Sequence, residues 1–323
     1  MNILITGCCG FIGFSLAKDF LELKKYRVLG IDDIDNYYDV NLKLNRLREL
    51  KKNKKFIFKK INIKNSSKID NFFKKNKIDI IFHFAAQAGV RYSFINPNKY
   101  LDSNINGFFN ILESAKKFKI KKTIIASSSS VYGDVKKLPV LEKYYSNERN
   151  LYAVSKSFNE KLAQIYSSKY KMKIYCMRFF TVYGEWGRPD MFMMKYANAS
   201  KDKKVFTLYN FGKHRRDFTY IKDVTYFLKK ILNKKIKSNF DIFNICSSRP
   251  VSLPKVINEL NKFFKKPKIV MKQRDDADVL HTHGSNKKLL NTFGHYKFTS
   301  LKDGVANLAS WYIKYYKLKK KVE

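Results

Sequence analysis

Long apolar runs, cysteines and repeated segments are scarce or missing in this chain of 323 residues. No apolar run is long enough to cross a bilayer as a helix, so we expect no membrane insertion. The four cysteines (Cys8, Cys9, Cys176 and Cys246) lack the paired spacing of a metal site, so we expect reduced structural thiols and no metal. We find neither an internal repeat nor a low-complexity linker, which argues against a modular array.

Acidic residues are scarce as well. The chain has 27 Asp and Glu against 66 Lys and Arg, which gives a formal net charge of +39. Such a charge could indicate a polyanionic partner, but the lysines are spread along the whole chain and no nucleic-acid-binding motif accompanies them. We therefore interpret the charge as a compositional background and expect no nucleic-acid partner. A general positive field would still help to gather an anionic substrate.

The composition that remains is that of a globular protein. A hydrophobic content of 45% and an aromatic content of 15% provide ample material for a core. The length suits one large α/β domain or such a domain with a smaller appendage. Residues 2–6 read as a strand and not as a charged signal peptide, so we expect a cytoplasmic protein.

Strand-like and helix-like segments alternate through the first half of the chain, which is typical of a parallel sheet covered by helices on both faces. The fold predicted is therefore α/β, a doubly wound parallel sheet of the Rossmann type. The expected strands are residues 3–6, 26–31, 56–61, 78–85, 123–127 and 174–179, and the expected helices are residues 11–23, 65–75, 100–118 and 150–171.

Three glycines follow the first expected strand and open the first helix. Gly7, Gly10 and Gly13 leave room for a tight turn, for a pyrophosphate close to the backbone and for the packing of helix on strand. The helix N-terminus then faces the phosphates. Phe11 and Ile12 lie within this predicted dinucleotide contact.

Asp32 ends the second strand, about twenty residues beyond the glycines, as the dinucleotide fingerprint requires. A carboxylate there can accept both ribose hydroxyls and repel a 2′-phosphate, which favours NAD over NADP. Asp33 or Asp35 could take the same role, and Asp32 could be an ordinary turn residue.

The third and fourth strands contribute further contacts to the predicted NAD site. A side-chain amide after the third strand could reach adenine, and small residues after the fourth strand allow the chain to run close to the cofactor. We expect His83 to be a packed core residue and not a catalyst. The predicted contacts are Asn62, Ile63, Ala85, Ala86 and Gln87.

The alternation of elements lapses after residue 181 and resumes with a helix at 222–232 and a strand at 241–246. Residues 35–55 form a long connection with a helical stretch at 40–50, which we expect to lie beside the cofactor. We therefore predict that residues 1–180 are the NAD-binding Rossmann domain and that 222–247 return to it. Residues 181–221 and 248–323 would form a smaller interleaved C-terminal substrate domain.

Tyr152 and Lys156 are four residues apart, so on a helix they share one face. A cation close to a phenol favours the phenolate, which predicts a lowered pKa and a base that works near neutrality. By itself this spacing is also that of an ordinary helix surface.

Taken together, these segments resemble the extended short-chain dehydrogenase/reductase (NAD-dependent epimerase/dehydratase) family, and within it the UDP-glucuronate 4-epimerases. The resemblance covers nearly the whole chain. The segments at 7–13 and 152–156 mark the broad family, whereas those at 31–40, 83–93 and 178–191 point to the uronate epimerases. Residues 127–133 and 216–221 also carry the resemblance.

The resemblance implies a catalytic set. Tyr152 would remove the proton from the 4-hydroxyl of the sugar, with Lys156 lowering its pKa and bonding the nicotinamide ribose. Ser128 would hydrogen-bond the same hydroxyl. Asn104 matches a position near the cofactor, although it could equally be a helix cap.

The resemblance also implies a UDP-sugar substrate. Arg216 would bind the diphosphate, and several donors would bind the sugar carboxylate. For Arg188 the alternative is a surface charge. The substrate-binding residues implied are Arg91, Ser129, Ser130, Thr181, Arg188, Arg216 and Arg274, with Asp278 as a further nucleotide contact.

The function implied is NAD-dependent epimerisation at C4 of a UDP-uronic acid, from UDP-glucuronate to UDP-galacturonate, through a transient 4-keto sugar. The nearest alternative is a UDP-glucose 4-epimerase, in which an Asn commonly replaces Thr181. Dehydratases and decarboxylases usually carry acidic residues where this chain has Ser129 and Ser130. A non-catalytic NAD-binding regulator would usually have lost Tyr152 or Lys156. The resemblance further implies a homodimer and a role in polysaccharide precursors.

Overall fold

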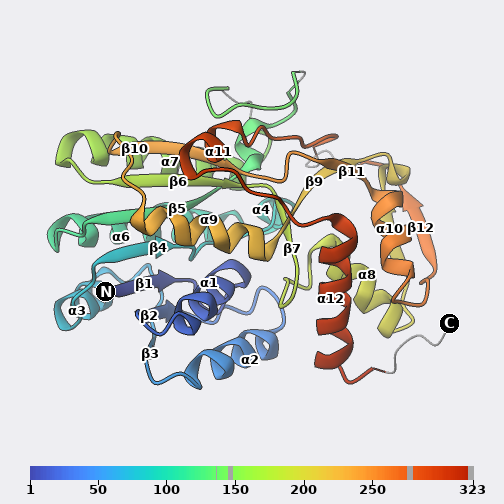
Figure 1. Ribbon diagram of the computed structural model, residues 1–323, viewed down its shortest axis with the longest axis horizontal. Helices are drawn as coiled ribbons and strands as arrows, with labels where there is room; N and C mark the ends of the chain where they lie inside the picture. Colours follow the sequence, from blue (N-terminus) through green and yellow to red (C-terminus); the bar gives the residue numbers. More distant parts are fainter. Residues whose placement is uncertain (136, 145–147, 275–278, 319–323) are drawn as a thin grey trace.

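Seven parallel strands form the central sheet of the computed structural model, which describes residues 1–135, 137–144, 148–274 and 279–318 (Figure 1). The strand order is β10-β6-β5-β4-β1-β2-β3. The predicted α/β fold with a doubly wound parallel sheet is confirmed. The strands are β1 (Asn2–Thr6), β2 (Arg27–Asp32), β3 (Phe56–Lys60), β4 (Ile80–His83), β5 (Lys122–Ser128), β6 (Ile174–Phe179) and β10 (Phe240–Ile245).

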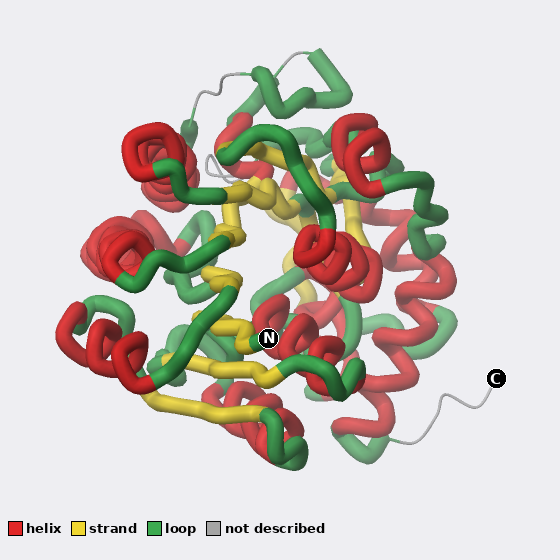
Figure 2. The backbone as a smooth tube through the Cα atoms, turned by 60° about the vertical axis from the view of Figure 1, so that its left-hand side comes forward, coloured by secondary structure: helices red, strands yellow, loops and turns green. Residues whose placement is uncertain are grey.

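Helices cover both faces of this sheet (Figure 2). Alternate residues of β1 show the reason, because Ile3 and Ile5 belong to the core under α1 (Phe11–Glu22) and α9 (Ile221–Asn233), whereas Leu4 belongs to the opposite core. The helices on that opposite face are α3 (Ser66–Lys75), α6 (Gly107–Lys117) and α7 (Leu151–Tyr170). Burial on both faces explains why β4 and β6 are apolar almost throughout.

The helix expected at residues 100–118 is interrupted. The chain forms α5 (Pro97–Tyr100), then a π-helical segment η1 (Leu101–Asn106), then α6. Asn104 lies in the wider turns of η1. Its side chain is buried, and its amide forms hydrogen bonds with the backbone of Gln87. Periodicity alone predicts the helix but not this widening.

The expected strand at 78–85 is also shorter, since β4 ends at His83. The next two backbone N–H groups, of Phe84 and Ala85, donate to the Thr6 hydroxyl over 3.2 and 3.1 Å. The chain therefore leaves the sheet where the cofactor contacts were predicted.

The second half of the chain adds two small sheets beside the carboxyl ends of the central strands. One sheet has the order β11-β9-β7, and in the other β12 pairs with β8. Figure 1 shows α8, α10 and α12 gathered around these sheets. The elements are β7 (Thr181–Tyr183), α8 (Phe192–Lys201), β8 (Phe206–Tyr209), β9 (Arg215–Tyr220), β11 (Pro250–Ser252), α10 (Leu253–Asn261), β12 (Ile269–Lys272), α11 (Lys287–Phe293) and α12 (Leu301–Tyr315).

The long connection after β2 contains α2 (Val40–Lys51), close to the predicted helix at 40–50. Arg46 of α2 is fully buried and joins this insertion to two distant segments. Its guanidinium donates to the carbonyl of Cys9 over 2.8 Å and to the carbonyls of Trp186 and Gly187. The insertion is therefore fastened to the glycine turn and to the segment that follows β7.

The sequence predicts neither disulfide bonds nor a membrane-spanning helix. All four cysteines are buried and free. Within the described residues, no helix is both long enough and apolar enough to span a membrane.

Asp19 of α1 connects the two helices on one face of the sheet. Its buried carboxylate accepts bonds from Lys222, Thr225 and Lys229 of α9 at 2.8 to 2.9 Å. Burial raises the pKa of Asp19, but these bonds together hold it below its usual value. The bonds therefore stabilise the folded chain only while the carboxylate is ionised.

We expect Asp19→Ala to lower the free energy of unfolding by about 2 kcal/mol, because it removes charge-assisted bonds from a buried acceptor. This decrease in the free energy of unfolding should reach its full size above about pH 4. It should become smaller as the pH falls through the lowered pKa of Asp19. Urea unfolding at pH 7 and pH 3 measures both effects. Glu49→Ala, which breaks an exposed pair with Lys52, is the control and should cost less than about 0.5 kcal/mol. Equal losses in the two variants would contradict this role.

Candidate active site

A cleft of about 700 Å³ opens at the carboxyl ends of the central strands and continues toward the small sheets. Parallel strands place their carboxyl ends at one edge, which is where α/β folds bind ligands. Twenty of the predicted site residues line this cleft: Gly7, Gly10, Phe11, Ile12, Gly13, Asp32, Asn62, Ile63, Ala85, Ala86, Gln87, Arg91, Ser128, Ser129, Ser130, Tyr152, Lys156, Thr181, Arg188 and Arg216.

The glycine turn has the shape that a dinucleotide phosphate requires. Gly7 has φ +71°, and a Cβ there would lie 2.7 Å from the backbone nitrogen of Ala85. A Cβ on Gly13 would lie 2.2 Å from the carbonyl oxygen of Gly7. The N-cap of α1 is Gly10, and no side chain caps the helix, so its first N–H groups can bind an anion. These residues fit NAD.

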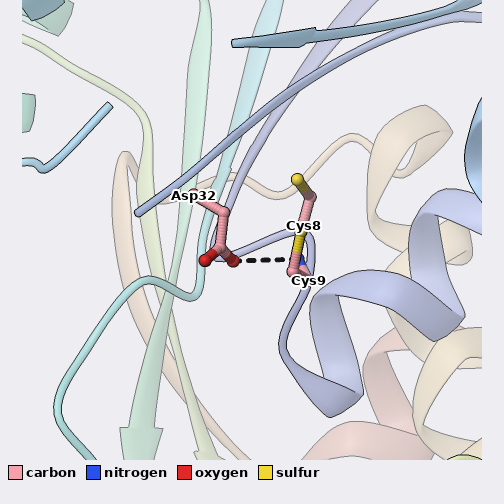
Figure 3. A group of neighbouring side chains, drawn as sticks. All are labelled: Cys8, Cys9 and Asp32. Atoms are coloured by element: carbon pink, nitrogen blue, oxygen red, sulfur yellow. Dashed lines mark hydrogen bonds between the residues drawn. The ribbon is translucent and has the colours of Figure 1, made fainter. Parts of the chain in front are cut away.

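Asp32 lies at the end of β2, beside the glycine turn (Figure 3). Its carboxylate accepts from the backbone N–H groups of Cys9 and Ile34, both over 2.8 Å. Burial raises the pKa of Asp32, while these two bonds act to lower it. The carboxylate is thus fixed at the edge of the cleft, where the ribose of a dinucleotide was predicted.

Cys8, Cys9 and Asp32 place their potential ligand atoms within 4.8 Å of one another, close enough to hold a metal ion (Figure 3). The geometry favours packing instead. Burial raises the pKa of the Cys8 thiol well above its usual value, and the Asp32 carboxylate already accepts backbone bonds. We assign these thiols to the core under the turn.

Asn62 and Asn104 have different positions relative to the cleft. Asn62 lines it and donates to the Asp33 carboxylate over 2.9 Å. Asn104 lies behind the lining, where its amide accepts from the backbone N–H of Gln87 and donates to the Gln87 carbonyl and the Ser155 hydroxyl. Asn104 therefore joins the segment after β4 to the helix that carries Tyr152, and it is not a helix cap.

The residues predicted to be catalytic come from α7 and the end of β5. The Asn150 side chain caps α7 by accepting from the Ala153 N–H over 2.9 Å, which starts the helix just before Tyr152. The Lys156 ammonium lies 5.9 Å from the centroid of the Tyr152 ring and donates to the Ala126 carbonyl over 2.9 Å. The structure thus brings the predicted pair together inside the cleft.

The predicted lowering of the Tyr152 pKa is wrong. Burial is the largest influence and raises the pKa of Tyr152, while a hydrogen bond with Ser128 and the charge of Arg188 act in the opposite direction. Burial also lowers the pKa of Lys156 to about 8. The sequence shows the spacing of the two groups but not the depth at which both are buried.

His83 is buried behind this set, and Thr6 Oγ1 lies 2.8 Å from its Nδ1. Burial, and then the charge of Lys156, lower its pKa to about 3. The imidazole is therefore neutral near pH 7, as expected for a packed core histidine.

Arg188 is not a surface charge. Its side chain is only 19% exposed, and its guanidinium pairs with Asp190, through Nε over 3.0 Å and through Nη2. The Tyr37 hydroxyl donates to the same carboxylate over 3.2 Å. Sequence reasoning missed Asp190 and Tyr37 as site residues, although both lie in the segments that carry the family resemblance.

The far end of the cleft contains two more arginines. Arg216 donates to the carbonyls of Val279 and Leu280 over 2.6 to 2.8 Å, and Arg91 lies over the ring of Tyr209, 3.8 Å from its centroid. Both line the cleft. Arg91 therefore connects the segment after β4 to β8, and Arg216 connects β9 to the segment at Val279 and Leu280.

Arg274 does not line the cleft. Its guanidinium pairs with Asp134 over 3.0 Å. The predicted contact Asp278 lies outside the described residues.

Comparisons with known proteins agree with this geometry. The model of the NAD-dependent epimerase/dehydratase family matches residues 3–246. The chain belongs to this family. The predicted cofactor, NAD, and the predicted enzyme class, an NAD-dependent epimerase, are confirmed.

Relatives extend this family assignment over nearly the whole chain. Protein CapI of Staphylococcus aureus is 36% identical, covering 98% of this chain and all of its own. A probable UDP-glucuronate 4-epimerase of Rhizobium meliloti is 34% identical, covering 98% of both chains. The crystal structure of the UDP-glucuronic acid 4-epimerase of Bacillus cereus, in complex with UDP-glucuronic acid and NAD, superposes with a TM-score of 0.91 at 29% identity, covering 98% of this chain and 100% of that one.

We expect Gly13→Ala to lose NAD, because its Cβ would collide with the Gly7 carbonyl and displace the phosphate-binding turn. The overpacking should also cost about 1–3 kcal/mol of stability. NAD retained after purification and the shift in melting temperature with added NAD measure the loss. Gly294→Ala is the control, since it strains a residue of φ +94° in open space. Equal NAD retention in both variants would refute this role of Gly13.

Proposed function

We propose that this protein interconverts UDP-glucuronate and UDP-galacturonate by inverting C4 of the sugar. The observation that carries the proposal is that the Tyr152 phenol, the Ser128 hydroxyl and the Arg188 guanidinium share one cleft with the NAD-binding glycine turn. The first two suit proton transfer at a sugar hydroxyl, and the third suits a carboxylate. The uronate epimerases among the relatives support the same substrate.

Tyr152 is the base of the proposed reaction. It takes the proton of the 4-hydroxyl while Ser128 hydrogen-bonds the same oxygen, and it returns the proton after the ring has turned. NAD held in this cleft would supply the redox chemistry at C4, as acceptor and later donor of a hydride. Residues of the glycine turn, Asp32 and Lys156 would hold it.

The carboxylate of the substrate creates a chemical hazard. A ketone at C4 next to a carboxylated C5 is a β-keto acid, which tends to lose carbon dioxide. Fixed donors can hold the carboxylate out of alignment with the ketone π system. We assign this task to Ser129, Ser130, Thr181 and Arg188, all of which line the cleft.

The nucleotide end must stay bound while the sugar turns. Arg216 and Arg91 supply positive charge at the far end of the cleft, where a diphosphate would be bound. We further propose that residues 181–221 and 248–323 form the nucleotide-sugar domain and that 1–180 with 222–247 form the NAD-binding domain. The place of β10 at the edge of the central sheet supports this division.

We also propose a homodimer. The helices on one face carry apolar side chains that are largely exposed, among them Phe109 of α6 and Val154, Phe158 and Ile165 of α7. A second copy would cover them. Because NAD and nucleotide sugars are cytoplasmic metabolites, we place the reaction in the cytoplasm and its product in the supply of polysaccharide precursors.

We expect the purified protein to convert UDP-glucuronate to UDP-galacturonate without added reductant. Tyr152→Phe should lower kcat about 100- to 10,000-fold, because it removes the proton acceptor. Separation of the sugar nucleotides by chromatography measures both. Tyr100→Phe is the matched control, since its buried ring contacts that of Tyr152 without lining the cleft, and it should keep most activity. A 4-keto-6-deoxy sugar, a pentose or no product from the unchanged protein would refute the function.

Arg188→Ala should release a pentose nucleotide, because the 4-keto acid would no longer be held against decarboxylation. The measurement is the ratio of UDP-pentose to UDP-galacturonate at equal substrate turnover. Arg216→Ala serves as the control and should raise KM without releasing pentose. If Arg188→Ala turns over with no pentose and an unchanged preference for the uronate, Arg188 has no part in holding the carboxylate.

A further inference from the structure

Glu160 continues the row that Tyr152 and Lys156 begin on α7. The three residues are spaced four apart, so they lie on one face of the helix, with Glu160 one turn beyond the ammonium. All of this face is turned into the protein, and the side chain of Glu160 is 7% exposed. Neither the glycine turn nor the proposed proton transfer accounts for a buried carboxylate at this place.

Three bonds hold the Glu160 carboxylate. Arg178 at the end of β6 donates to it through Nε over 2.8 Å and through Nη2 over 2.7 Å. The Ser127 hydroxyl of β5 donates as well. Two parallel bonds from one guanidinium fix the carboxylate in place.

The Glu160 carboxylate and the Lys156 ammonium both bond to neighbouring residues of β5. Lys156 bonds the carbonyl of Ala126, and Glu160 bonds the hydroxyl of the next residue, Ser127. Both side chains are shielded from water, so their charges act on each other through a medium of low polarity. Burial lowers the pKa of Lys156 to about 8, and Glu160 acts to raise it.

Other charged or titratable groups face Lys156 from each neighbouring element. His83 of β4 is neutral near pH 7, because its pKa is lowered to about 3 by burial and by Lys156. Tyr152 stands on α7 itself, and Arg178 of β6 lies beyond Glu160. Glu160 is therefore the carboxylate nearest along this row.

We propose that Glu160 holds Lys156 in its charged form, and that Arg178, by pairing with Glu160, sets the strength of this effect. Glu160 is thus a positioning residue that acts through Lys156. The inference rests on the proposed function only for the use that Tyr152 makes of the lysine.

The two partners of the ion pair predict opposite results. Glu160→Gln removes the negative charge, so the titration midpoint of Lys156 should fall by about one pH unit or more. Arg178→Met leaves Glu160 unneutralised, so the midpoint should rise. Glu160→Asp keeps the charge and should stay near the midpoint of the unchanged protein. If the pair had only a structural role, the Lys156 midpoint would shift in the same direction in Glu160→Gln and Arg178→Met, or it would not shift.

The measurement is an NMR titration of the full chain labelled with 13C at the lysine ε carbons, without substrate. Lys156→Arg identifies the signal. Glu113→Gln is the control, because its carboxylate pairs with Lys116 away from this row, and it should leave the midpoint unchanged. Opposite shifts in Glu160→Gln and Arg178→Met support the proposal, and equal or absent shifts overturn it.

Removing one partner of a buried ion pair is strongly destabilising and could prevent folding. The double variant Glu160→Gln/Arg178→Met then decides, since it leaves no buried unpaired charge. Its midpoint should lie below that of the unchanged protein, and a midpoint at or above that value refutes the proposal.

Activity provides a second, separable readout. In Glu160→Gln the alkaline limb of kcat should move to lower pH, with KM for UDP-glucuronate within about twofold. If the unchanged protein does not act on UDP-glucuronate, the proposed function fails while the titration still tests Glu160.

Discussion

The parallel alignment of the seven central strands is the constraint on which the rest of the structure depends. Every strand ends at the same edge of the sheet, so residues far apart in the chain meet there without long excursions. Gly7 follows β1, Asp32 ends β2, Ser128 ends β5 and Thr181 follows β6. One topological rule thus assembles both the cofactor cradle and the reacting groups.

Burial gives these groups their chemical properties. Lys156 and Asp32 are buried, and Tyr152 and Arg188 are partly buried. Each one has a fixed hydrogen-bond partner, which for Lys156 comes from a different element and for Arg188 from the same segment. The site therefore works as a set of matched charges and hydrogen bonds, in which no single residue sets its own ionisation.

The sequence is enough to predict the sheet, the glycine turn and the catalytic spacing, because each leaves a local signal. Alternating apolar runs indicate β1 to β6, and three glycines mark the turn at Gly7 to Gly13. After residue 181 the sequence still predicts α9 and β10, close to their observed bounds. It does not predict β7 and β11, which have only three residues each, too few to show a period. The widening at Asn104 escapes it because its cause is a bond to Gln87.

Electrostatic properties are harder still to predict. The spacing of Tyr152 and Lys156 predicts a lowered phenol pKa, but burial reverses the direction. The partner of Arg188 is only two residues away, whereas Tyr37, which completes that cluster, is 153 residues from Asp190. Such pairings become visible only when the chain is folded, since no local pattern records them.

The buried arginine of the insertion has a consequence for the evolution and redesign of this scaffold. Arg46 ties together three stretches of chain through backbone carbonyls, which every residue type possesses. The acceptor residues can therefore change side chain without losing these hydrogen bonds, whereas Arg46 cannot. Grafting this insertion between homologous scaffolds transfers the whole fastening with a single side chain, and trimming it away leaves the glycine turn and the segment after β7 without their common anchor.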